Sequence, residues 1–112
     1  MEVVSYTMSD HEITLLVVGR KVKAKPPVTL RVGQTVQYTA PNGKIRIEFP
    51  DGSPFDIEEV RDSLPHTILK AGQYTGHCFV TLDGETEELG WSLGDDDAGV
   101  IHDVENPPPP PG

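Results

Sequence analysis

Hydrophobic and polar positions alternate along this chain over short stretches separated by turns, a pattern typical of β-strands. In 44–49, three apolar side chains alternate with three charged ones, so we expect Ile45, Ile47 and Phe49 to be buried on one face. Charged residues alternate with apolar ones in 20–25, which indicates a half-exposed or edge strand. The candidate strands are 3–8, 12–18, 20–25, 28–32, 35–40, 44–49, 66–69, 74–82, a stretch within 86–93, and 100–104.

Two turn signals connect these segments. Asn42-Gly43 is a preferred pair for a tight hairpin because both residues tolerate positive φ. It predicts that 35–40 and 44–49 pair as antiparallel neighbours. Asp83-Gly84 predicts a second hairpin after the long strand 74–82.

One segment favours a short helix. Ser53 is typical of an N-cap, Pro54 of the first helical position, and Asp56 approximates a capping box. The helix is expected to end before Pro65. The residues that would complete this helix are Ile57, Val60, Arg61 and Leu64.

These elements predict one all-β domain over residues 1–105, followed by an extended Pro-rich tail over 106–112. The expected architecture is an antiparallel Greek-key sandwich, cupredoxin-like or immunoglobulin-like, of about seven to nine strands with one short helix. The 112 residues suffice for one hydrophobic core. The tail is expected to be a plain disordered terminus, with a ligand for an aromatic-lined groove as the alternative.

Charge is divided unevenly along the chain, whose formal net charge is −9. Residues 1–50 hold seven Lys and Arg against four Asp and Glu, whereas residues 51–112 hold two against fourteen. Nucleic acid and anionic membranes need clustered positive charge, so both are excluded as expected partners. The only basic cluster is interpreted as a solvated strand face; it comprises Arg20, Lys21, Lys23 and Lys25.

Cysteine usage and the N-terminal sequence bear on location. Cys78 is the only cysteine, so no internal disulfide forms. The first residues show no positively charged segment followed by an apolar one, and no apolar run is long enough to span a membrane. A cytoplasmic location is the expectation.

Two segments carry a family resemblance. The sequence VTLRVGQTV at 28–36 is similar to a "V-x-V-x-x-G-D-T-V" strand and glycine turn, and AGQYTGHC at 71–78 is similar to a "G-x-Y-x-Y-x-C" strand. The short helix expected after Phe49 adds to these motifs, and on all three the stretch from about 26 to 104 resembles the cupredoxin family, whose fold often has a helix at that place. The resemblance implies a β-sandwich, with Cys78 at the position of the copper-ligating cysteine.

The other copper-ligand positions depart from that pattern. A blue copper site needs two His and one Cys in a trigonal plane with a weak axial ligand. Segment 49–55 offers no His, and residues 79–84 contain neither His nor Met. The sequence therefore predicts no metal or cofactor. The alternative is a metal site that uses Cys78 with His66 or His77, although successive strand residues such as His77 and Cys78 point to opposite faces.

No catalytic constellation is evident, so no site residue is assigned and a small enzyme ranks third. A Cys78–His77 pair has the same orientation problem and no clear orienting Asn or Asp. The run Asp95–Asp97 lacks the spacing of an EF-hand and is interpreted as a solvated loop. Trp91 is expected in the core, with an exposed partner anchor as the alternative.

The leading hypothesis is a non-catalytic, copper-free, cupredoxin-like binding module for an unknown protein partner. The acidic second half favours a basic partner. We expect its carboxylates to gather on one face beside an apolar anchor such as Trp91 or Phe79. These carboxylates are Glu85, Glu87, Glu88 and Asp95–Asp97.

Overall fold

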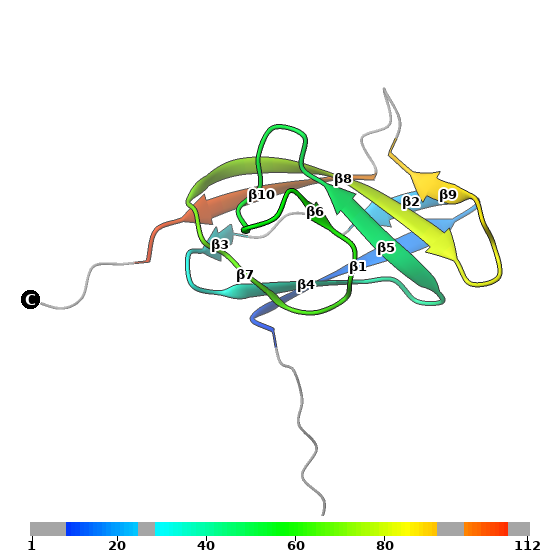
Figure 1. The fold of residues 1–112 in the computed structure, drawn as a ribbon, viewed down its shortest axis with the longest axis horizontal. Helices are drawn as coiled ribbons and strands as arrows, with labels where there is room; N and C mark the ends of the chain where they lie inside the picture. Colours follow the sequence, from blue (N-terminus) through cyan, green and yellow to red (C-terminus); the bar gives the residue numbers. More distant parts are fainter. Residues whose placement is uncertain (1–8, 25–28, 92–97, 108–112) are drawn as a thin grey trace, which may run out of the picture.

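The computed structural model describes residues 9–24, 29–91 and 98–107, and within them the chain forms ten strands in two sheets (Figure 1). The first sheet has four strands in the order β2-β1-β4-β7. Its members are β1 (His11–Val18), β2 (Lys21–Ala24), β4 (Thr35–Thr39) and β7 (His66–Thr67). The expected edge position of the charged strand is confirmed, because β2 lies at the border of this sheet.

The second sheet has six strands, five of them in the order β3-β10-β8-β5-β6, while β9 pairs with β8. The strands are β3 (Thr29–Arg31), β5 (Gly43–Glu48), β6 (Glu59–Val60), β8 (Gly72–Leu82), β9 (Glu88–Gly90) and β10 (Gly99–Glu105). The predicted all-β sandwich is confirmed. The described residues contain no helix long and apolar enough to cross a membrane.

The core lies between the two sheets and consists of the inward side chains of their alternating strands. Ile45, Ile47 and Phe49 are buried as predicted. Burial of each such side chain stabilises the folded state by roughly 1.5–3 kcal/mol. Gly76 and Cys78 of β8 face this core, whereas Lys44 of β5 is exposed.

The predicted hairpin between 35–40 and 44–49 is wrong. β4 pairs with β1 and β7, whereas β5 pairs with β8 and β6. Asn42 does adopt the positive φ of a tight turn, at 61°, but the turn carries the chain from one sheet to the other. Its carbonyl accepts a hydrogen bond from the Asp83 amide at 2.8 Å.

The fully antiparallel arrangement is also wrong, because both sheets are mixed. β1 runs parallel to β4, and β3 runs parallel to β10. Both pairs join strands that are not adjacent in the chain, and such pairs are not constrained to antiparallel geometry by a tight turn.

The predicted helix after Ser53 is wrong as well. Phe55 is buried against Tyr38 and Phe49 in edge-to-face contacts, and Val60 is buried as part of β6. A bent, non-helical segment over 54–58 followed by β6 delivers both side chains to the core while β6 pairs with β5. Ile57 and Leu64, which the helix was to use as apolar positions, are 42% and 60% exposed.

Strand β8 organises the second sheet. One edge of β8 pairs with β5, whereas the other edge pairs first with β10, through residues 72–77, and then with β9, through residues 79–81. β9 therefore continues the line of β10 and projects near the β1–β2 hairpin of the first sheet (Figure 1). The predicted strand 3–8 and the run Asp95–Asp97 lie outside the described residues, as does most of the tail at 106–112.

Candidate functional site

The structure separates the residues of the alternative metal site. Cys78 is fully buried in β8, and burial raises the pKa of its thiol to about 12. Without a metal ion the thiol therefore stays protonated at neutral pH. The ring of His77 lies on the other face of β8, as alternation predicts, and stacks on Trp91 with ring centroids 3.7 Å apart.

His66 does not join Cys78 either. It lies on β7 of the first sheet, where Nε2 is 2.8 Å from Oδ1 of Asp62, and its ring packs near Phe55. In the part of the chain that the structure describes, no three His, Cys, Asp or Glu side chains are grouped so that they could hold a metal ion.

Sequence reasoning missed a buried polar pair in the core. Tyr38 of β4 and His102 of β10 are both fully buried, and the Tyr38 hydroxyl lies 2.5 Å from His102 Nε2. Burial raises the pKa of Tyr38 and lowers the pKa of His102 to about 4, so both groups are neutral at pH 7. The alternation of Val100, His102 and Val104 is the signal that could have placed His102 inside.

The outer face of the six-stranded sheet carries a network around Arg46. Its guanidinium covers the Phe79 ring at 4.0 Å and contacts Glu48, Glu59 and Glu88. The pKa of Glu88 is lowered chiefly by its hydrogen bond to Arg46. Because this network joins β5, β6 and β9 and its carboxylates are paired, it serves to hold the sheet together.

Trp91 follows β9 and is partly buried against the core. This finding lies between the two expectations for that residue, the core and an exposed anchor. Its amide donates to the Cys78 carbonyl at 3.0 Å, and its ring covers His77.

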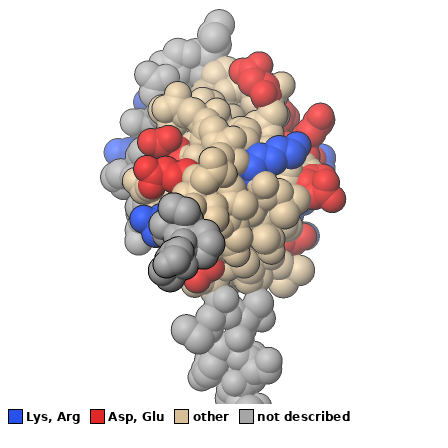
Figure 2. Space-filling view, turned by 90° about the vertical axis from the view of Figure 1, so that its left-hand side faces the viewer, with Lys and Arg blue, Asp and Glu red and all other residues tan. Residues whose placement is uncertain are grey.

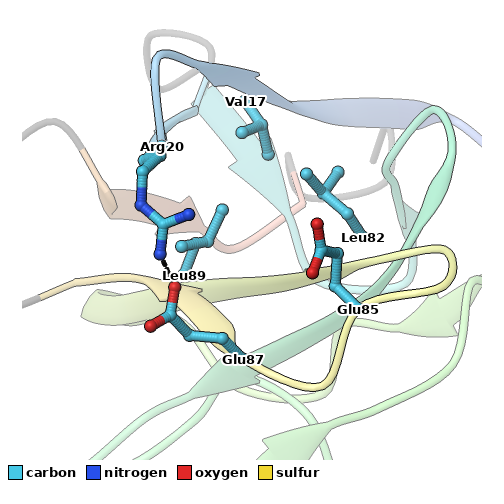
Figure 3. A pocket seen from close by; sticks show the side chains of 6 residues that line it. All are labelled: Val17, Arg20, Leu82, Glu85, Glu87 and Leu89. Atoms are coloured by element: carbon cyan, nitrogen blue, oxygen red, sulfur yellow. Dashed lines mark ion pairs between the residues drawn. The ribbon is translucent and has the colours of Figure 1, made fainter.

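A small apolar hollow opens where the two sheets meet at the β9 end of the sandwich (Figure 3). Its volume is about 60 Å³. Val17 of β1 faces Leu82 and Leu89 from the opposite sheet, and the carboxylate of Glu85 stands beside Leu82. We call this site the acid-rimmed hollow; its lining residues are Val17, Arg20, Leu82, Glu85, Glu87 and Leu89.

One ion pair crosses the acid-rimmed hollow. Arg20 lies in the tight turn between β1 and β2, where Gly19 and Arg20 have φ values of 56° and 69°. From there its guanidinium contacts the carboxylate of Glu87, which belongs to the β8–β9 hairpin (Figure 3). The side chains are 72% and 62% exposed, so solvent screens the attraction and the pair contributes little to stability.

The structure divides the three glutamates of the β8–β9 hairpin. Glu85 and Glu87 line the acid-rimmed hollow beside leucines, whereas Glu88 points to the outer face and joins Arg46 near Phe79. Within β9, Glu88 and Leu89 are successive residues whose side chains point to opposite sides, so Glu88 faces away from the hollow that Leu89 lines. The far end of the sandwich differs: Figure 2 shows a mostly uncharged face with a cationic side chain lying across it and carboxylates on both sides.

Comparisons with known proteins add little information about function. No family model matches the sequence, and no curated protein matches it. Among solved structures, a reduced Cu(I) form of an amicyanin mutant at pH 4 is similar, with 15% sequence identity and a TM-score of 0.41. The match covers 88% of this chain and 86% of that chain. These values are too low to assign a family or to transfer the copper of amicyanin.

Proposed function

We propose that this chain is a non-catalytic, copper-free, cupredoxin-like binding module that holds a basic protein partner at the acid-rimmed hollow. The observation that carries the proposal is an apolar floor open to solvent between two carboxylates, those of Glu85 and Glu87. Leu82 and Leu89 remain partly exposed there, so a partner side chain that covers them gains hydrophobic contact.

The charge of the chain supports a basic partner. Fourteen carboxylates against two cationic side chains in residues 51–112 produce a negative potential that attracts cations and repels anions. The attraction should weaken with salt, because the Debye length falls to about 8 Å at physiological ionic strength. Charge attracts the partner, and the hollow supplies the contact that fixes its position.

The core supports the copper-free and non-catalytic parts of the proposal. Cys78 is a protonated, buried thiol, His77 lies on the opposite face of its strand, and His66 is held by Asp62 in the other sheet. The cupredoxin-like part rests on the segments 28–36 and 71–78.

The test compares the proteins retained by three immobilised forms at low and high salt. The first form is the unaltered chain, and the second carries Glu85→Gln with Glu87→Gln. The third carries Glu12→Gln with Asp103→Asn, which changes net charge equally at two exposed residues that do not line the hollow. We expect a salt-sensitive partner to be lost from the second form only. Equal retention by the second and third forms would exclude the hollow as the site.

A further inference from the structure

We propose that the acid-rimmed hollow takes the side chain of a lysine of the partner, and that Arg20 of this chain competes with that lysine. This inference rests on the proposed function and adds the chemistry of the recognised group. It follows from the size of the hollow, its charge, and the position of Arg20.

Size and lining favour one aliphatic side chain. A volume of about 60 Å³ suits one aliphatic side chain. The floor formed by Val17, Leu82 and Leu89 is wholly aliphatic. A lysine stem buries methylene groups on such a surface while its ammonium stays at the polar rim.

The rim of the hollow has one carboxylate at which a cation of a partner could bind. Arg20 already contacts Glu87, whereas no cation of the described residues forms an ion pair with Glu85. The carboxylate of Glu85 stands beside Leu82, where the end of a side chain lying on the floor would meet it (Figure 3). The four-carbon stem of lysine is longer than that of arginine, so lysine places more aliphatic surface on the floor while its compact ammonium reaches the carboxylate.

Arg20 is the internal competitor. It approaches from the β1–β2 turn and reaches Glu87 across the mouth of the hollow (Figure 3). Both partners are largely exposed, so the pair is weak, and Arg20 competes with an ammonium at Glu85 by placing a second positive charge at the mouth. Removal of Arg20 would leave two unpaired carboxylates at the rim and should strengthen binding of a cation.

The experiment titrates the protein with blocked tripeptides whose central residue is lysine, arginine or norleucine, and follows the backbone amide signals of Leu82, Glu85 and Leu89 by NMR. Norleucine keeps the aliphatic stem and lacks the charge. Each peptide is tested on the unaltered chain, on Glu85→Gln and on Arg20→Asn. Asparagine removes the cation and tolerates positive φ, so the turn is kept.

We expect the lysine peptide to bind more tightly than the other two, Glu85→Gln to weaken it about three-fold, and Arg20→Asn to strengthen it by a similar factor. Glu12→Gln should change nothing. Equal binding of the lysine and norleucine peptides, or weaker lysine binding by Arg20→Asn, would overturn the inference. A partner that depends on Glu85 and Glu87 without lysine-peptide binding would leave the proposed function intact and sink only this inference.

Discussion

At the scale of single residues, the pair formed by Tyr38 and His102 is the most consequential feature of the core. It ties β4 of one sheet to β10 of the other through a 2.5 Å contact. His102 Nδ1 has no hydrogen-bond partner among the described residues. A buried polar atom without a partner lowers stability, and a charge at that position would lower it further.

The lowered pKa of His102 predicts that stability falls on acidification. The unfolded chain binds a proton near the ordinary pKa of 6.5, whereas the folded chain resists it until about 4. The contribution of neutral His102 to the free energy of unfolding is therefore complete above pH 6.5, and it is lost progressively as pH falls toward 4. At 1.36 kcal/mol per pKa unit, the free energy of unfolding falls by about 3 kcal/mol when this contribution is fully lost. Urea unfolding at several pH values measures it.

The control replaces both partners, as Tyr38→Phe with His102→Phe, so that no polar group is left unpaired. We expect the slope of stability against pH between 6.5 and 4.5 to become shallower in that variant. Glu59, Asp62 and Glu88 have lowered pKa values and lose their contributions only below their ordinary pKa range. An unchanged slope would show that the folded protein protonates His102 as readily as the unfolded chain does, so that the fold does not lower the pKa of His102.

The sequence was more informative about single positions than about their partners. Alternation identified Ile45, Ile47 and Phe49 as core, and the same rule applied to 100–104 would have placed His102 inside. It could not pair His102 with Tyr38, because that contact depends on how the sheets pack. Similarly, Glu85 and Glu87 were predicted to contribute to a binding surface, but the leucines beside them were not.

At the scale of elements, β9 positions the acid-rimmed hollow, and Gly90 allows it to lie close to β8. Gly90 has φ of 149°, and an added Cβ would lie 2.2 Å from the Cys78 carbonyl oxygen. No other residue fits this approach without displacing the strand. The position of Leu89 and Glu87 therefore depends on a glycine at the end of β9.

Gly90→Ala should destabilise the protein by roughly 1–3 kcal/mol and separate β9 from β8. Hydrogen exchange should show this locally, as faster exchange of the Trp91 amide that bonds to the Cys78 carbonyl. Gly84→Ala is the matched control, since it also has positive φ but nothing lies within 4 Å of the added Cβ. If both variants behaved alike, the close approach of β9 would not matter.

Other elements show why sequence signals can identify a turn or strand and still miss its partner. Asn42-Gly43 specified a tight turn correctly, yet β5 joined β8 rather than β4. Ser53 and Pro54 suggested a helix start, but burial of Phe55 and pairing of Val60 with Ile47 favoured a bent segment that ends in a short strand. In both cases tertiary packing outweighed a local preference.

At the scale of the whole molecule, the acid-rimmed hollow exists because the sandwich brings two hairpins together. Val17 and Arg20 come from the β1–β2 hairpin, and the remaining lining residues come from the β8–β9 hairpin. No local sequence pattern links these segments, so the site could be found only in the folded structure. The opposite end of the sandwich, in contrast, presents a mostly uncharged face with a cationic side chain lying across it (Figure 2).

Site-specific photo-crosslinking tests the central claim, binding of a basic partner at the acid-rimmed hollow, most directly. A benzophenone amino acid is placed at Thr86, an exposed residue between Glu85 and Glu87, or at Leu69, which is 48% exposed near the start of β8. We predict that irradiation with the salt-sensitive partner gives a crosslink from position 86 that high salt abolishes, and none from position 69. A crosslink from position 69 alone would contradict the account.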